Sequence, residues 1–291
     1  YPCRVDLQSA GRVRKNNKNG LRRVFFGGEN VTKQDLKDKV EHMIPLFEKR
    51  KVYVGERFDE DEEPFPDRER QEKFMAITEK GKKKAISIPS SQYELVQTRS
   101  VFKNILDKLP ENTTGKVHHY RARGKSAMKL FPNDQKTGIW IVNSVDRGMA
   151  LRATFVKKTE EGDIHIPKDK VGYSRMHKGD VETDMEDLMD VLSKVDKIWE
   201  NIVDDIASKE VDEDDLEKIE NIIGEKAFEE VEDKIDNWKI APDGSKSSKN
   251  PSFWKLITWS INAISERNYS SEIHKEEKIR GISTRILALS M

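Results

Sequence analysis

The stretch that decides the fold is Gly138-Ile139-Trp140-Ile141-Val142-Asn143-Ser144-Val145-Asp146-Arg147-Gly148-Met149-Ala150-Leu151-Arg152. The apolar residues 139–142 predict a buried strand, and residues 150–156 predict a second one. The residues between them favour a turn, because Asn, Ser and Asp bond their own backbone and Gly accepts strained conformations. The stretch therefore predicts a tight β-hairpin at the centre of a sheet. Its polar turn is also a candidate binding loop held by two rigid strands.

A second hairpin is predicted at residues 117–131, with Gly124 at its turn. Because side chains alternate along a strand, His119, Arg121 and Arg123 are expected on one face. Further strands are expected at residues 22–26, 74–78, 84–88 and 164–166. The first half of the chain is thus predicted to be rich in antiparallel strands.

Helices are predicted mainly in the second half. In the first half, Thr32 is expected to cap a helix to about Lys51, which Pro45 would kink or end early, and Ser100 to cap another to about Leu109. Amphipathic helices are expected at residues 182–206, 216–223 with Gly224 as the stop, 227–238, 251–265 and 273–289.

The predicted fold class is α+β, with an antiparallel, sheet-rich, basic N-terminal half followed by an acidic helical C-terminal half. The expected divisions are a basic flexible arm at residues 1–30, an α+β domain at 31–178 and a helical domain at 182–291. With 291 residues the chain is long enough to bury a substantial core.

Composition restricts the cellular compartment in which the protein is expected. Cys3 is the only cysteine, so no disulfide forms within the chain and a reducing compartment is favoured. No apolar run approaches the roughly 20 residues that cross a bilayer. We therefore expect no membrane partner and a cytoplasmic location.

Charge is distributed unevenly, although the formal net charge is zero. Residues 80–178 hold 21 Lys or Arg against 9 Asp or Glu, whereas residues 182–236 hold 22 acids against 6 Lys. Three explanations stay open. The basic half binds a polyanion, or acidic helices of the same or a neighbouring chain neutralise it, or both surfaces are simply solvated.

The candidate interface combines cations that would follow phosphates with aromatic rings that would stack on unpaired bases. Its residues are Arg121, Arg123, Lys125, Lys129, Arg147, Arg152, Tyr120 and Trp140. The leading hypothesis is a nucleic-acid-binding protein, with single-stranded DNA binding or annealing in recombination or replication as its most concrete form. A homo-oligomer is the expected assembly.

Two alternatives come from other classes of protein. The first is a protein–protein assembly or counter-defence factor, in which exposed acids and a Trp199 ridge on the long helix bind a partner. The second is a metal-dependent hydrolase built on Asp146 and His177. Catalysis is the less favoured class, because the sequence contains no phosphate-binding loop, dinucleotide fingerprint or nucleophile elbow. No cofactor or metal is therefore expected.

Four segments carry a resemblance to a known family. They are residues 92–97 with Val101-Phe102, residues 138–151, Met176-His177-Lys178-Gly179, and residues 254–267. In these segments the chain resembles the phage/plasmid-like family catalogued as domain of unknown function 932. Arg147-Gly148-Met149 stands where the family pattern has Gly-Ser, and the usual Cys-x-Asn-Gly element is absent. The resemblance implies a mobile-element protein in a prokaryotic cytoplasm and supplies no activity.

Overall fold

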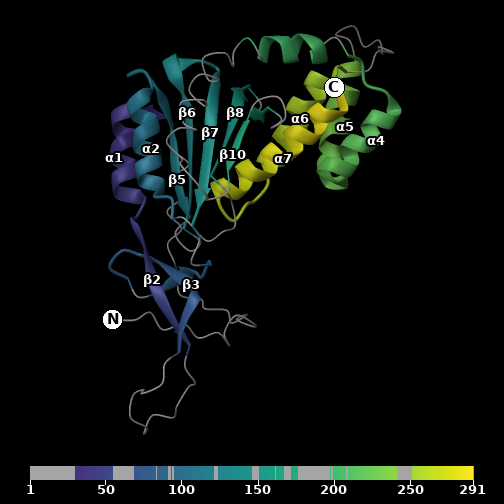
Figure 1. The fold of residues 1–291 in the computed structure, drawn as a ribbon. Helices are drawn as coiled ribbons and strands as arrows, with labels where there is room; N and C mark the ends of the chain where they lie inside the picture. The colour runs from purple at the N-terminus through teal and green to yellow at the C-terminus, as the bar shows by residue number, and fades with distance from the viewer. Residues whose placement is uncertain are drawn as a thin grey trace.

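The computed structural model describes residues 30–54, 69–82, 84–90, 93, 95–120, 124–145, 151–160, 162–166, 172–175, 197, 199–207, 209–240 and 251–290. The predicted α+β class is confirmed, with strands concentrated in the N-terminal half and helices in the C-terminal half (Figure 1). Nearly all of the predicted N-terminal arm lies outside the described residues, as does the predicted junction between the halves near residue 180.

A large antiparallel sheet forms the centre of the molecule. Its strand order is β1-β5-β6-β7-β8-β10, and β9 also pairs with β8. The strands are β1 (Val31–Thr32), β5 (Thr114–Tyr120), β6 (Lys125–Phe131), β7 (Thr137–Ser144), β8 (Leu151–Lys158), β9 (Asp163–His165) and β10 (Gly172–Arg175). The two predicted hairpins are confirmed as β5–β6 and β7–β8.

The two faces of this sheet have different partners. Met128, Ile141 and Ala153 pair across three strands on the face that α1 (Lys33–Met43) and α2 (Thr98–Lys108) cover (Figure 1). β6 and β7 are buried on both faces. Residues 139–142 of β7 are accordingly apolar without alternation, whereas β6 has Lys125, Ser126 and Lys129 at buried positions.

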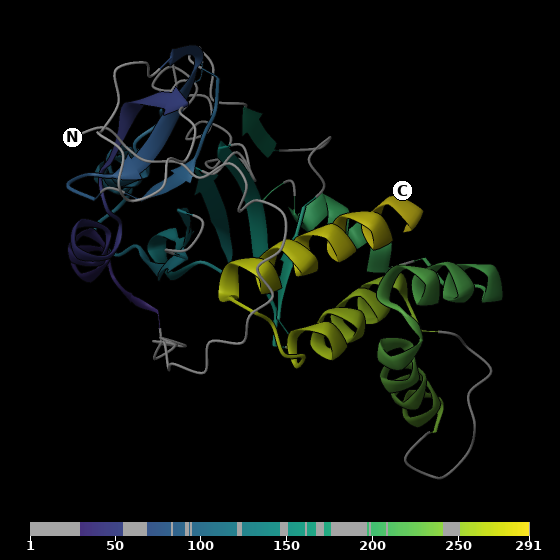
Figure 2. The ribbon, with the colours of Figure 1, turned by 90° about the horizontal axis from the view of Figure 1, so that it is seen from below.

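The opposite face of the sheet is crossed by α7 (Glu272–Ser290), whose Ile273 packs with Trp140 and Val142 (Figure 2). Toward its C-terminal end, α7 joins a group of helices that precede it in the sequence (Figure 1). They are residues 199–207, α4 (Glu213–Ile223), α5 (Glu225–Lys239) and α6 (Phe253–Ser265). One hydrophobic cluster includes residues from both halves, so the helices and the sheet share a core. No helix among the described residues is both long and apolar enough to cross a membrane.

A separate three-stranded sheet lies beyond one end of the large one and consists of β2 (Phe47–Val54), β3 (Glu69–Glu79) and β4 (Ala85–Ser87) (Figure 1). The prediction of a helix to Lys51 is wrong, because α1 ends at Met43 and the chain then enters β2. Ile44 is extended, as expected for a residue that precedes proline, and Pro45 cannot continue the helix.

The β2–β4 sheet packs against the end of the large sheet at Gly124. Phe47, Ile77 and Val145 share a hydrophobic cluster at this junction. Gly124 has a φ of 55°, and a Cβ added there would lie 2.3 Å from Val145 Cγ2. Glycine is therefore required at this turn by both conformation and space.

Helix ends largely follow the predicted signals. Thr32 caps α1 by accepting from the Asp35 N–H, and a capping box joins Asp212 and Asp215 at the start of α4. Gly224 ends α4 as predicted. Ser100 is not a cap, because α2 begins at Thr98.

Two glycine substitutions are expected to change stability in opposite directions. A Cβ on Gly138 would lie 2.2 Å from the Leu130 carbonyl oxygen and 2.6 Å from the Phe131 ring, so Gly138→Ala should lower the free energy of unfolding by about 1–3 kcal/mol. Gly281, within α7, has open space around it, so Gly281→Ala should raise that free energy by about 0.5–1 kcal/mol. Urea unfolding of both variants is the measurement, and equal effects would contradict the packing described.

Candidate nucleic-acid interface

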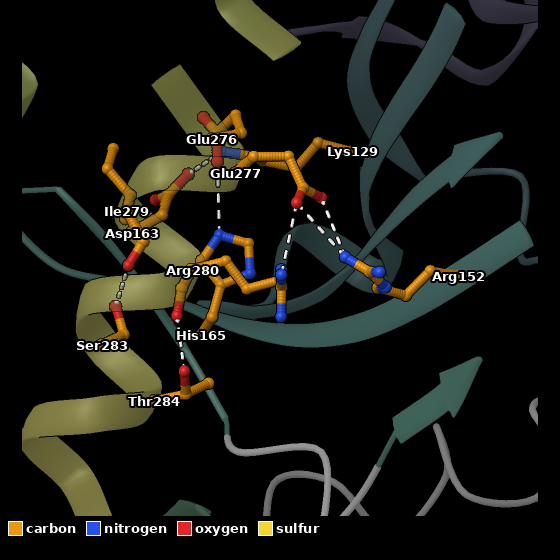
Figure 3. A network of polar contacts seen from close by, with 10 residues as sticks. All are labelled: Lys129, Arg152, Asp163, His165, Glu276, Glu277, Ile279, Arg280, Ser283 and Thr284. Carbon is orange, nitrogen blue, oxygen red and sulfur yellow. Dashed lines mark hydrogen bonds and ion pairs between the residues drawn. The ribbon is translucent and has the colours of Figure 1, made fainter. Parts of the chain in front are cut away.

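Lys129, one of the predicted phosphate-binding residues, lies in the interior under α7 (Figure 3). Its ammonium group donates to Asp163 at 2.6 Å and to Glu276 at 2.5 Å. Glu276 also lies 3.3 Å from Nε2 of His165, which is fully buried. Lys129 therefore joins β6, β9 and α7 and has no free charge to offer a phosphate.

The pKa values of this cluster show how firmly the charges are held. Burial opposes the charged form of Lys129, but Glu276 and Asp163 together outweigh burial and raise its pKa. Burial likewise acts to raise the pKa of Glu276, yet Lys129 and His165 hold it far below its usual range. Burial lowers the pKa of His165, so its imidazole is neutral at pH 7. The cluster is thus a buried ion pair of Lys129 with carboxylates.

Arg152 occupies a neighbouring position on the same face of the sheet. Its guanidinium lies 3.2 Å from Glu277 of α7, and Glu277 is also 3.2 Å from Arg280 (Figure 3). All three side chains are largely buried. Arg152 is therefore positioned by α7 rather than by an external ligand.

The two predicted stacking residues are also engaged inside the protein. Trp140 is 1% exposed and packs edge-on against His165, with ring centroids 5.6 Å apart. Tyr120 is half-buried, and its ring lies 6.4 Å from that of His274. The prediction that Trp140 offers a ring to an unpaired base is wrong, because α7 and β9 cover it.

Lys125 lies at the end of the sheet that meets the β2–β4 sheet. Lys125 is 5% exposed at the start of β6. Arg121, Arg123 and Arg147 lie outside the described residues. The strands that flank them end together, because Tyr120 pairs with Lys125 and Lys125 pairs with Ser144.

These contacts answer part of the question of charge asymmetry. Acidic side chains of the same chain neutralise part of the basic sheet. Among the described residues, the acids that pair with Lys129 and Arg152 are Asp163 of β9 and Glu276 and Glu277 of α7. The strongly acidic helices α4 and α5 lie at the far end of the molecule from the β2–β4 sheet (Figures 1 and 2).

Exposed basic residues are instead concentrated on the β2–β4 sheet. Its exposed lysines are Lys49, Lys51, Lys80, Lys82 and Lys84. Glu48 and Glu79 are the acids of residues 47–51, 74–82 and 84–88, and they bind Arg50 at 2.6 Å and Lys82 at 2.8 Å respectively. Phe74 of β3 is 44% exposed and adds an aromatic ring to this surface. Sequence reasoning missed this surface, although the run of lysines at residues 80–84 could have indicated it.

A row of buried or partly buried polar residues crosses the other face of the large sheet. His119 Nδ1 lies 2.9 Å from Ser126 Oγ, Ser126 pairs with Asn143 on the next strand, and Asn143 donates to Thr98 of α2 at 2.7 Å. Burial lowers the pKa of His119 to about 4, against weaker opposing effects of Glu79 and the Lys125 backbone. His119 is therefore neutral at pH 7. The row joins three strands to the first turn of α2.

The hydrolase and protein–protein assembly hypotheses each depend on particular residues. Asp146 and His177 lie outside the described residues, so the hydrolase hypothesis stays a prediction. No group of three or more His, Cys, Asp or Glu side chains among the described residues is arranged to hold a metal ion. Trp199 does not form an exposed ridge, because it is fully buried and packs edge-on against Trp254.

Two of the four segments that carry the family resemblance can be placed in the fold, whereas residues 176–179 lie outside the described residues. The central run at residues 138–151 leads from β7 to β8, and residues 254–267 correspond to α6 and its end. The resemblance itself stays a prediction. Comparison of the chain with protein-family models, curated proteins and solved structures found no match.

Proposed function

We propose that this protein binds nucleic acid, with single-stranded DNA as the preferred ligand, through the β2–β4 sheet. The observation that carries the proposal is the concentration of exposed lysines on that sheet, where Glu48 and Glu79 are bound to neighbouring cations and β3 also contains Glu69 and Glu72. Such a surface attracts phosphates regardless of sequence. The exposed Phe74 supplies a ring on which an unpaired base can stack.

Three arginines of the predicted interface lie outside the described residues but are close in the sequence to described residues of this junction. Gly124, which follows Arg121 and Arg123 in the sequence, packs against the β2–β4 sheet. Arg147 follows Val145, which belongs to the same junction. We therefore extend the proposed interface from the lysines to these three arginines. Annealing or protection of single strands during phage or plasmid recombination, in a prokaryotic cytoplasm, is the proposed role.

The test is binding of labelled single-stranded and duplex DNA across a salt series. We expect tight binding at low salt that weakens steeply as salt rises, because phosphate contacts release counterions. Lys80→Glu combined with Lys84→Glu should weaken binding at least about tenfold at roughly 0.1 M salt and flatten the salt dependence. Phe74→Leu should weaken binding to single strands more than to duplexes.

The matched control reverses two exposed lysines at the other end of the large sheet. Lys136 and Lys158 are exposed and joined by a backbone hydrogen bond of 2.7 Å beside the β6–β7 turn. Lys136→Glu with Lys158→Glu makes the same change in net charge and should leave affinity within about twofold. Equal losses in the two double variants would overturn the assignment to the β2–β4 sheet.

Exposed acids on α4 and α5 favour a second candidate function, assembly with a basic protein partner. These acids are Glu213, Asp214, Glu217, Glu225, Glu229, Glu230, Glu232, Asp233 and Asp236. They lie far from the β2–β4 sheet and its exposed lysines, although Lys218 and Lys226 are exposed on the same two helices (Figure 2). No DNA binding at low salt would favour this function over the first.

A further inference from the structure

The outer edge of β2 has a defined pattern of backbone groups. β2 is at the edge of its three-stranded sheet. The Leu46 carbonyl accepts from the Lys80 N–H at 2.8 Å, so Leu46 faces the inner strands. Successive residues of an antiparallel strand point their N–H and C=O groups in opposite directions. The backbone groups of Phe47, Lys49 and Lys51 therefore point outward, and those of Glu48 and Arg50 point toward β3.

Phe47, the first of these outward-facing residues, already has hydrogen-bond partners for both of its backbone groups. The Phe47 N–H donates to Gln97 Oε1 at 3.1 Å, and Gln97 Nε2 donates to the Phe47 carbonyl at 2.7 Å. One side-chain amide thus makes the pair of hydrogen bonds that a neighbouring strand would make. No described residue bonds the outward backbone groups of Lys49 or Lys51.

The side chains beside the outer edge of β2 are cationic. Lys49 and Lys51 are exposed and lie on the same face of β2, whereas Arg50 is on the other face and binds Glu48. Like charges directly opposite each other destabilise a strand pair, so a second copy of β2 is a poor partner. An acidic strand is complementary to both the backbone and the side chains.

We propose that the outer edge of β2 binds an extended acidic peptide segment of a partner protein by strand addition, next to the position that Gln97 already occupies. Backbone hydrogen bonds from Lys49 and Lys51 supply the pairing, and acidic side chains opposite the two lysines supply specificity. This goes beyond the proposed function, because it uses backbone groups that phosphate binding does not need. It also predicts that such a peptide and DNA compete, since they share the two ammonium groups.

The probe is a labelled, acetylated peptide in which Glu alternates with Val, titrated with the full chain. Lys49→Gln removes a charge and keeps the N–H, so it should weaken binding about threefold. Lys49→Pro also removes the outward N–H, so it should weaken binding at least about tenfold. Proline is tolerated at an edge position whose N–H faces solvent, so this variant should fold.

Methylated peptides test the strand pairing from the other side. Residues that directly oppose Lys49 or Lys51 in a hydrogen-bonded pair place their side chains on the same face as the lysines. N-methylation of the Glu residues should therefore abolish binding, and N-methylation of the Val residues should leave it nearly unchanged.

Hydrogen exchange gives a readout that needs no variant. Addition of the peptide should slow exchange at the Lys49 and Lys51 amides and leave the Arg50 amide, which already faces β3, unchanged. Equal binding by Lys49→Pro and Lys49→Gln, or uniform protection of residues 49–51, would overturn strand addition and indicate general electrostatic attraction. The proposed DNA binding is measured without peptide, so either proposal can fail alone.

Discussion

Lys129→Met is expected to lower the free energy of unfolding by about 3–5 kcal/mol, measured by urea unfolding at pH 7. Methionine approximately preserves the volume of the lysine stem, so the expected loss comes from charge. The ammonium group of Lys129 sits between Asp163 and Glu276 with only 8% of the residue exposed. Without it, two carboxylates stay buried with no cation between them.

A neighbouring lysine provides the matched control. Lys116 pairs with Lys129 across β5 and β6 and lies on the same face of the sheet, but it is only partly buried. Lys116→Met should change stability by no more than about 0.5 kcal/mol. Adding Glu276→Gln to Lys129→Met should recover part of the loss, because it removes one uncompensated charge. Equal costs for the two single substitutions would show that the buried contacts do not hold α7 on the sheet.

Acidification from pH 6.5 to pH 4 should cost the protein about 3 kcal/mol through His119 alone. Burial lowers the pKa of His119 to about 4, whereas the unfolded chain takes up the proton near its usual 6.5. Between these values the unfolded state binds more protons than the folded state. Stability is therefore complete above pH 6.5 and falls as the pH drops toward 4.

Two substitutions in the polar row isolate this effect. His119→Gln should reduce the loss of stability between pH 6.5 and pH 4 by most of that amount, because the titrating group is gone. Ser126→Ala removes the hydroxyl 2.9 Å from Nδ1 but keeps the imidazole, so it should cost about 1 kcal/mol and retain the pH dependence. Urea unfolding at both pH values is the measurement. An unchanged pH dependence in His119→Gln would contradict the burial of a neutral imidazole.

Local patterns in the sequence predicted most of the elements. Alternation and turn residues identified the hairpins β5–β6 and β7–β8, and capping chemistry identified the starts or ends of helices at Thr32 and Gly224. These signals work because they depend on residues a few positions apart. The prediction failed where two local signals competed, at Pro45, where helical periodicity continued past a residue that ends the helix.

The candidate interface was less predictable, because exposure depends on what packs over a strand. The sequence analysis assigned Lys129 and Trp140 to one candidate interface, and the strand register places them opposite each other on neighbouring strands. The sequence did not indicate that α7 covers this face of the sheet. Both residues were predicted to lie on a binding surface and are in fact buried. The lysines that are exposed near the proposed interface belong instead to the β2–β4 sheet.

The sequence by itself thus determined the strands, most helix ends and the uneven charge, all of which arise from neighbouring residues. Only the tertiary structure decided which charges are free. Lys129 and Glu276 are 147 positions apart, and Phe47 and Gln97 are 50 apart. No local pattern specifies such pairs, since they form only when the docking of whole elements brings distant side chains together and removes water from between them.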